Sequence, residues 1–199
     1  TTTNVGLDFT IFNNKIIGTL DWYNKNTTDM LFNYRVSASL VPGGNLWANG
    51  GSINNKGLEL SLTATPVRGK LFNWNTTLNL ATNKNEITSL QGPYGNSDSI
   101  RYSDPEGPGQ TGATLQLLKT GKPLGQFFSL IYAGKNASGV STFSKRDGTT
   151  TTNPAIGTDY FYLGNAQPKM LIGWNNSFRF NKWDLNFFLR GVFGHKIFN

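Results

Sequence analysis

The sequence contains no cysteine and only one histidine among its 199 residues. Without cysteine, the chain can form neither a disulfide framework nor a thiolate metal site. The single histidine, His195, would need a carboxylate and a nucleophile or metal beside it for catalysis, and we expect it in a solvated loop. No glycine loop followed by Lys-Ser/Thr, which would cradle a phosphate, is present. The sequence therefore predicts no enzyme activity, no cofactor and no metal site.

Acidic residues are also few, and the 18 basic residues leave a formal net charge of +7. A basic chain can bind nucleic acid, but only where lysine and arginine cluster. Here the basic residues are spread out, many beside predicted turns, and the densest pair, Lys145-Arg146, lies in a polar loop. The charge therefore predicts no nucleic-acid partner and favours contact with anionic lipid headgroups.

The chain has no run of about 18 apolar residues, which excludes a transmembrane helix. Residues 168–194 instead alternate with a period of two on both sides of the Asn181-Lys182 turn. One set of alternate positions is mostly apolar: Met170, Ile172, Trp174, Asn176, Phe178, Phe180, Trp183, Leu185, Phe187, Leu189, Gly191 and Phe193. Two strands joined so tightly predict an antiparallel hairpin with one apolar and one mostly polar face.

The length of these strands indicates the kind of hairpin. Soluble strands usually run about 5–6 residues, whereas residues 183–193 extend over about 33 Å at roughly 3.3 Å per residue. A tilt of about 40° brings the rise to about 25 Å, the height of the apolar band of an outer-membrane barrel. Aromatic residues at the turn end fit a membrane-facing girdle. This predicted girdle comprises Phe72, Trp74, Phe178, Phe180 and Trp183.

Two further hairpins follow the same pattern, at residues 5–22 and 58–80. Their polar positions are rich in asparagine and threonine, which suits a water-filled or plug-facing lumen better than a dry core. Irregular tracts at residues 36–51, 84–121 and 134–167 are expected at the ends opposite the short turns. Residues 126–133 are apolar but break the strand parity, so we expect them inside the outer loop region. Short turns at one end and long loops at the other predict an all-β, antiparallel transmembrane β-barrel segment.

Aromatic residues in the long loops are candidates for contact with a substrate or a lid protein, because exposed rings bind sugars, peptides and proteins efficiently. Packing within their own loops is the alternative for each of them. These residues are Trp47, Tyr94, Tyr102, Phe143, Tyr160 and Tyr162.

Several strings resemble the C-terminal part of SusC/RagA-like TonB-dependent transporters of Bacteroidetes. They are NVGLDFTIFNNKIIGTLDWYNKNTTDMLF, GGSINNKGLELSLTATPV, FNWNTTLNLATNKNEITSL, TGKPLGQFFSLIYAG and YFYLGNAQPKMLIGWNNSFRFNKWDLNFFLRGVFGHKIFN. The resemblance covers nearly all of residues 1–199. It implies a plugged barrel of the 22-stranded class in the bacterial outer membrane. It also implies import of oligosaccharides or peptides, driven by TonB, together with a SusD-like lipoprotein lid.

Three departures from the resembled pattern bear on function. No plug or TonB box is recognisable, and no aromatic-ending strand follows Asn199, so we expect this chain to be part of a longer polypeptide. The loop that in many relatives carries a carboxylate-rich run reads SKRDGTTTT, which leaves Asp147 without companions for calcium. A different class remains as the alternative: a secreted or surface all-β binding module, such as an adhesin or a carbohydrate-binding sandwich.

Overall fold

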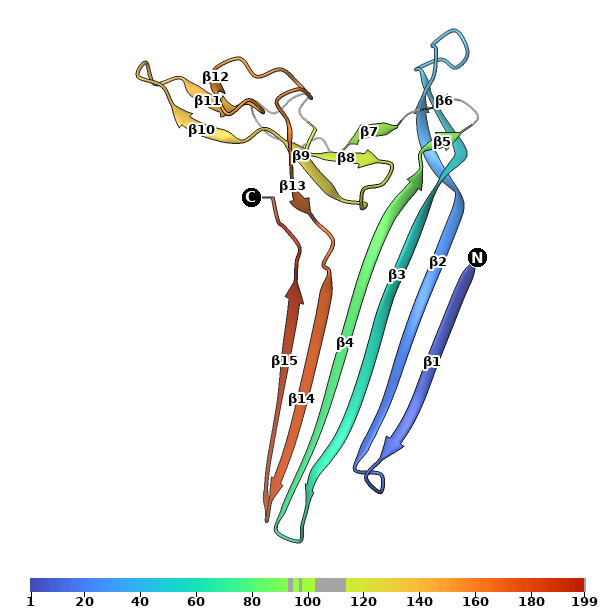
Figure 1. Cartoon of the computed structure of the whole chain (residues 1–199), viewed down its shortest axis with the longest axis vertical. Helices are drawn as coiled ribbons and strands as arrows, with labels where there is room; N and C mark the ends of the chain where they lie inside the picture. Colours follow the sequence, from blue (N-terminus) through green and yellow to red (C-terminus); the bar gives the residue numbers. More distant parts are fainter. Residues whose placement is uncertain (93–94, 97, 103–113, 199) are drawn as a thin grey trace.

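The computed structural model describes residues 1–92, 95–96, 98–102 and 114–198. Its main element is a six-stranded antiparallel sheet in the order β1-β2-β3-β4-β14-β15, which runs almost the full height of Figure 1. The strands are β1 (Thr2–Ile11), β2 (Ile16–Arg35), β3 (Asn45–Arg68), β4 (Phe72–Ser89), β14 (Met170–Phe180) and β15 (Trp183–Phe193). The three predicted hairpins are confirmed as β1–β2, β3–β4 and β14–β15, and β14 pairs directly with β4.

The strand register gathers the apolar positions of all six strands on one face. A single row across the sheet, here called the upper apolar row, consists of Val5, Trp22, Leu58, Thr82, Met170 and Phe193. Because side chains alternate along each strand, every second residue below this row points the same way. At the turn end, Phe72, Phe180 and Trp183 stand in register with one another. The result is a continuous apolar face about ten residues tall, opposite a mostly polar face.

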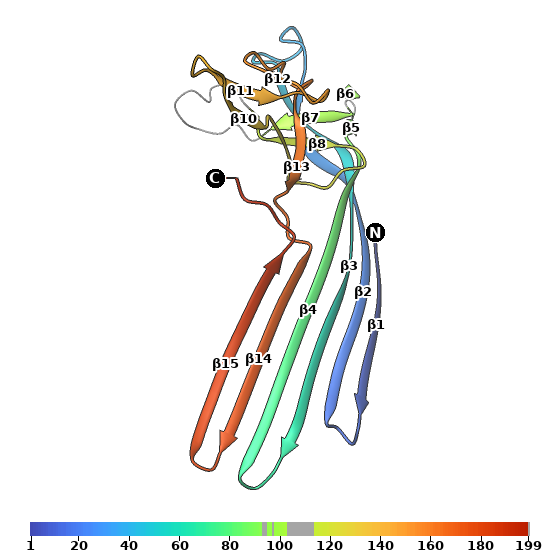
Figure 2. The same ribbon diagram turned by 60° about the vertical axis from the view of Figure 1, so that its left-hand side comes forward.

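The three hairpin turns lie at the same end of the sheet, as Figures 1 and 2 show. Asn13, Asn14 and Asn181 adopt positive φ angles of 55°, 65° and 54°. Asparagine tolerates this left-handed conformation, which tight hairpin turns require in order to match the right-handed twist of the flanking strands. The Asn181 N–H also donates to the Leu71 carbonyl of the neighbouring hairpin at 2.8 Å. The asparagines therefore favour short turns locally, and one hydrogen bond links the β14–β15 turn to the β3–β4 hairpin.

A group of small sheets, here called the outer platform, occupies the opposite end (Figure 1). One sheet has the order β13-β9-β8-β7, a second is β10-β11-β12 and a third is β5-β6. The strands are β5 (Gln91–Gly92), β6 (Gly95–Asn96), β7 (Ser99–Tyr102), β8 (Gln116–Lys119), β9 (Gln126–Ser129), β10 (Tyr132–Lys135), β11 (Ser141–Ser144), β12 (Thr150–Thr151) and β13 (Phe161–Asn165). The expectation that residues 126–133 belong to the outer loops is confirmed by β9.

The platform has small cores of its own. Ile87, near the upper end of β4, and Leu90, just after this strand, pack with Leu118 of β8. Leu117 and Phe128 pack with Tyr160 in a second cluster. These are among the few buried apolar side chains in the described part of the chain, and the first cluster packs the platform against the upper end of β4.

The predicted boundaries of the irregular tracts are wrong in part. β3 already begins at Asn45 and β4 continues to Ser89, and short strands occupy parts of residues 84–121 and 134–167. The string NLWANGG at the start of β3 has no apolar alternation, so sequence pattern could not reveal it. Pairing with β2, from Arg35↔Asn45 to Met30↔Gly50, imposes the strand there instead.

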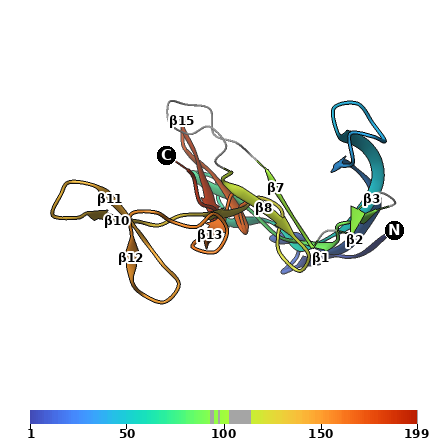
Figure 3. The ribbon, with the colours of Figure 1, turned by 90° about the horizontal axis from the view of Figure 1, so that it is seen from above.

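The described residues include no helix long and apolar enough to cross a membrane. Seen from above in Figure 3, the long sheet is bent, with β15 and the N-terminal strands toward opposite ends. Strands β1 and β15 form the two edges of this sheet and each pairs on one side only within the described residues.

Candidate functional site

The polar face of the long sheet carries a ladder of cross-strand hydrogen bonds between β3 and β4. Ser61 Oγ donates to Asn79 Oδ1 at 2.8 Å, and Thr65 Oγ1 donates to Asn75 Oδ1 at 2.9 Å. Between them, the Thr63 and Thr77 hydroxyls lie 3.2 Å apart. The register sets Ser61 opposite Asn79 and Thr63 opposite Thr77, and the Thr65–Asn75 bond falls at the irregularity between Ala64 and Val67. Among the described residues each of these asparagines uses only its oxygen, which leaves its amide hydrogens available to a ligand.

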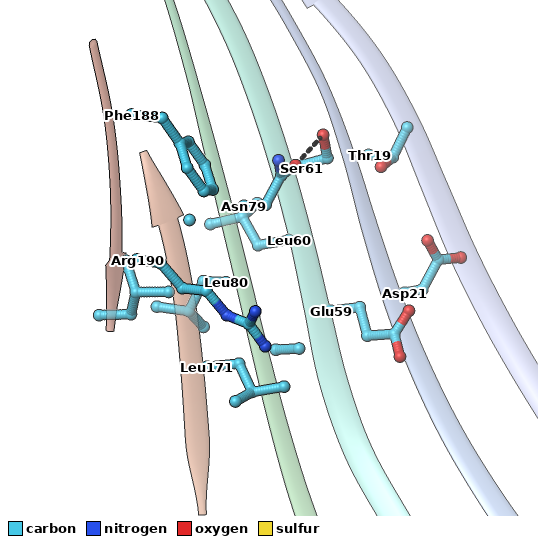
Figure 4. Close-up of a pocket in the computed structure, with 13 residues that line it drawn as sticks. Thr19, Asp21, Glu59, Leu60, Ser61, Asn79, Leu80, Leu171, Phe188 and Arg190 are labelled. Atoms are coloured by element: carbon cyan, nitrogen blue, oxygen red, sulfur yellow. Dashed lines mark hydrogen bonds between the residues drawn. The ribbon is translucent and has the colours of Figure 1, made fainter. Parts of the chain in front are cut away.

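A shallow cavity of about 380 Å³ lies on the same face, level with the middle of the strands. Its polar lining comes from four strands: Thr19, Asp21, Glu59, Ser61, Asn79 and Arg190. Figure 4 shows the Asp21 and Glu59 carboxylates side by side, with the Arg190 side chain extending toward them from β15. Within the described residues, none of these three charges forms an ion pair closer than 4.0 Å. The lining of this cavity thus presents both signs of charge beside neutral hydrogen-bonding groups.

Like charges directly opposite on neighbouring strands are unfavourable, and Asp21 is paired in register with Glu59. Such an arrangement is tolerated where the side chains are solvated or meet a cation. A second polar cavity of about 460 Å³ near the turns includes the exposed Arg179–Asp184 ion pair, 2.9 Å long. An exposed pair of this kind adds little stability.

The opposite face carries an aromatic cluster near the turns. Phe178 stacks on Trp74 at 5.6 Å between ring centroids, on Phe72 at 6.3 Å and on Phe187 at 5.9 Å. Phe180 and Trp183 extend the cluster toward the turn with 60% and 76% of their surfaces exposed. The structure thus brings the five predicted girdle residues together on one face. Their contact with lipid stays a prediction.

A buried amide, Asn176, lies within this cluster and was not singled out as functional by the sequence. It is fully buried, and its Oδ1 accepts a hydrogen bond from Trp74 Nε1 at 3.1 Å. Its amide nitrogen has no partner among the described residues. A similar bond runs from Trp174 Nε1 to Thr76 Oγ1 at 2.8 Å. The only sequence signal was an asparagine in an otherwise apolar set of alternate positions.

The predicted loop aromatics fall into two groups in the structure. Trp47, on the upper part of β3, and Tyr162, on β13, are exposed by 63% and 42%. Tyr102 and Phe143 are half-buried, Phe143 against the Tyr132 ring. Tyr160 is only 5% exposed and belongs to a platform core, as the loop-packing alternative expects. Tyr94 lies outside the described residues.

Cations surround the aromatic rings of the platform. Arg101 lies over the Tyr160 ring at 5.6 Å, and Lys122 lies over the Tyr162 ring at 5.0 Å. Burial raises the pKa of the Tyr102 hydroxyl, against the opposing effect of a backbone hydrogen bond from Gly125. Tyr162 therefore combines exposure with a neighbouring positive charge, an arrangement suited to polar or anionic ligands.

Asp147 is fully engaged in its own turn. Its Oδ1 accepts hydrogen bonds from the Thr149 N–H at 2.9 Å and the Thr149 hydroxyl at 2.6 Å, and its Oδ2 accepts one from Lys145 Nζ at 3.1 Å. The Thr149 bonds, followed by Lys145, lower the pKa of this carboxyl to about 2. In the described residues no group of three or more His, Cys, Asp or Glu side chains gathers to hold a metal ion.

Comparison with known proteins places these surfaces in context. No protein-family profile matches the chain. The chain is 28% identical over 200 residues to the TonB-dependent receptor SusC of Bacteroides thetaiotaomicron, with 100% of the chain and 20% of the receptor covered. A TonB-dependent receptor of Formosa agariphila is 28% identical over 213 residues, covering 98% of the chain and 20% of that receptor. The chain thus spans about a fifth of the length of these relatives.

Solved structures show the same fold. The RagAB peptide importer in its open-open state superimposes with a TM-score of 0.80 and 22% identity, covering 98% of this chain and 20% of that one. Its closed-closed state gives a TM-score of 0.79 and 23% identity, with 98% and 21% covered. A sheet with one apolar and one hydrogen-bonded polar face, short turns at one end and long loops at the other, is therefore part of a transmembrane barrel. Over its whole length the chain is thus similar to TonB-dependent receptors of the SusC/RagA type, and its place is the bacterial outer membrane.

Proposed function

We propose that residues 1–199 form the C-terminal part of the barrel of an outer-membrane importer. This importer takes up oligosaccharides or peptides with energy transmitted by TonB, and a SusD-like lipoprotein acts as its lid. The observation that carries the proposal is the two-faced long sheet, apolar on one side over all six strands and hydrogen-bonded and polar on the other. Coupling to TonB belongs to a plug region that lies outside these residues.

In this arrangement the apolar face contacts lipid and the aromatic cluster around Phe178 forms the girdle near the periplasmic turns. Aromatic rings concentrate at membrane–water interfaces because they combine an apolar body with a polar group. Trp74 and Trp174 satisfy their indole N–H groups within the protein. These two rings therefore meet hydrocarbon without an unpaired donor.

The polar face lines the lumen and is exposed to substrate or plug. Sugars and peptides both present hydroxyl, amide and carbonyl groups, which the amide and hydroxyl ladder of β3 and β4 can match. The charged groups Asp21, Glu59 and Arg190 provide additional contacts for a zwitterionic peptide or for polar groups of the plug. Transport by binding, with no bond made or broken, is the activity that this surface supports.

On the outer platform, Trp47 and Tyr162 are the candidate substrate or lid contacts with the largest exposed fractions. Tyr102 and Phe143 offer smaller exposed areas. A peptide as substrate draws support from the RagAB structures, whose name describes a peptide importer. An oligosaccharide is equally compatible with exposed aromatic rings.

The alternative, a secreted all-β binding module, conflicts with the apolar face. Val5, Leu7, Leu185 and Leu189 on this face are each more than half exposed. Soluble monomers rarely leave contiguous apolar surfaces of this extent uncovered. A lipid environment removes the conflict.

Uptake by intact cells tests the proposal. Cells producing the full-length protein should accumulate labelled oligosaccharides or peptides from a defined panel, and loss of either the protein or TonB should abolish that uptake. The variants Trp47→Ala and Tyr162→Ala should raise the substrate concentration needed for half-maximal uptake. Leu40→Ala, at an exposed apolar residue of the β2–β3 loop, serves as the matched control. Uptake that persists without the protein or without TonB would contradict the proposal.

A further inference from the structure

A pair of lysines stands on the apolar face directly above the apolar band. Lys56 of β3 and Lys84 of β4 are partners in register. They occupy the same alternate positions as Leu58, Leu60 and Leu80, so their side chains emerge on the lipid side. They lie two residues beyond the upper apolar row, which is about 7 Å farther along the strands. This height is that of the lipid headgroups on the loop side of the membrane.

The surface changes character sharply at this level. Asn24 continues the lysine row on β2, and Asn26 and Asn54 stand in the row above. Asn54 Nδ2 donates to Asn24 Oδ1 at 2.6 Å. A hydrogen-bonded amide cluster therefore follows the last apolar row without a transition. The outer boundary of the hydrocarbon must fall at or just below the lysine pair.

The lysine pair is electrostatically incomplete within the described residues. Lys56 makes no ion pair there, and Lys84 has only a 3.9 Å contact with Glu86, with side chains 69% and 41% exposed. Two like charges directly opposite on adjacent strands destabilise the sheet unless a counter-charge lies between them. Glu86 can neutralise only one of the two.

A cavity of about 490 Å³ opens beside the pair. Lys56, Lys84 and Lys169 line it together with the Glu86 carboxylate, and Asn83, Asn165 and Gln167 belong to the same lining. The Asn165 amide nitrogen already donates to the Leu124 carbonyl at 2.8 Å. Three ammonium groups against one carboxylate leave a net positive charge around this space, which favours an anion with several oxygens. Its position at headgroup height selects among the possible anions, because a soluble anion would gain nothing from the adjacent apolar band.

We propose that Lys56 and Lys84 bind the phosphate group of an outer-leaflet lipid, whose acyl chains lie along the apolar face below. The lysines supply positive charge at the headgroup level, where it attracts anionic lipid. The upper apolar row supplies contact for the chains. The proposal rests on the outer-membrane placement and is independent of which substrate is imported.

Lipid retention by the full-length receptor tests the site. The protein is reconstituted into phosphatidylcholine nanodiscs containing either phosphorylated or dephosphorylated lipid A, and bound lipid is counted by native mass spectrometry. We expect preferential retention of the phosphorylated form. The variant K56Q/K84Q should lower this preference about tenfold or more, and K56R/K84R should preserve it. The variant E86Q should strengthen retention, because it removes the competing carboxylate.

Two controls separate this site from general charge. The variant K15Q/K70Q removes two lysines beside the turns at the opposite end and should leave retention unchanged. Inorganic phosphate at millimolar concentration should not displace the lipid. Equal losses in K56Q/K84Q and K15Q/K70Q, or displacement by inorganic phosphate, would overturn the proposal. Uptake assays on the same variants report on import separately, and heat-modified mobility on gels verifies that each barrel is folded.

Discussion

At the residue scale, Asn176 is a polar side chain buried in apolar surroundings. Its amide is fully buried among Trp74, Phe178 and Phe187 on the apolar face, where a leucine would meet the pattern of its neighbours. The hydrogen bond from Trp74 satisfies the amide oxygen of Asn176, whereas the amide nitrogen has no partner among the described residues. A buried donor without a partner costs about 1–3 kcal/mol. Asn176 therefore matters mainly as the acceptor for Trp74.

We expect Asn176→Leu to leave the Trp74 indole N–H without an acceptor, at a cost of about 1–3 kcal/mol that is offset in part because the variant also removes the unpartnered Asn176 amide nitrogen. Trp74→Phe in the same background should recover most of this loss. Urea unfolding in lipid vesicles measures all four members of the cycle. Strictly additive effects would show that the Trp74–Asn176 bond contributes nothing.

Asp147 provides a pH-dependent element at the same scale. Its pKa falls from 3.8 to about 2 because Thr149 and Lys145 stabilise the charged form. A carboxyl whose pKa is lower in the folded state stabilises that state above the unfolded pKa and loses this contribution as pH falls. We expect protection of the Thr149 amide against hydrogen exchange to decline as pH drops from about 4 toward 2. In Asp147→Asn the decline should vanish, and an unchanged profile would contradict the assignment.

At the element scale, strand β15 tests which face meets lipid. Leu189 pairs with Trp174 and is 54% exposed, whereas Arg190 pairs with Gly173 and lines the polar cavity. Leu189→Arg should destabilise the barrel by about 2–4 kcal/mol if position 189 lies near the bilayer midplane. Arg190→Leu should have a smaller effect. Comparable losses at both positions, measured by unfolding in vesicles, would refute the two-faced sheet.

The upper ends of β2 and β3 depend on glycine at Gly50. The Tyr34 ring is 5% exposed, and its hydroxyl lies against Gly50 and Gly92. A methyl group at position 50 would overlap this hydroxyl, so we expect Gly50→Ala to destabilise the upper strands by about 1–3 kcal/mol. Tyr34→Phe should partly restore them, because it removes the overlapping oxygen. Hydrogen exchange of residues 45–53 measures the effect, and an unaltered exchange rate in Gly50→Ala would contradict it.

Sequence pattern predicts the membrane-level elements well, because there each strand has one face in lipid and alternation is enforced. Leu58, Leu60 and Leu62 alternate with Gly57, Glu59 and Ser61, and the observed register places them as expected. Above the band the constraint disappears, and the start of β3 at Asn45 leaves no signal. Asn176 and the Lys56–Lys84 pair were also missed, since each depends on cross-strand neighbours distant in sequence. The buried Tyr160 and the exposed Trp47 are distinguished only by tertiary packing.

At the scale of the whole molecule, the edges β1 and β15 control behaviour outside a membrane. An open edge in lipid leaves a row of unpaired amide groups, each costing several kcal/mol. We propose that strands outside the present residues pair with both edges. The full-length protein should then fractionate with the outer membrane and dissolve only in detergent. Residues 1–199 produced alone should aggregate in plain buffer; a folded, monodisperse product detected by size-exclusion chromatography would favour the binding-module alternative.

The adjacency of β4 and β14 has a consequence for how such proteins diversify. Their register runs unbroken from Phe72↔Phe180 to Thr82↔Met170, although 80 residues of sequence separate Ser89 from Met170. The chain leaves the long sheet after β4 and returns to it as β14, directly beside β4. Part of the packing of the platform is internal, as in the cluster of Leu117, Phe128 and Tyr160. The segment between β4 and β14 can therefore be exchanged or recombined during evolution without a change in the long sheet. New ligand preferences can evolve without the barrel having to fold anew.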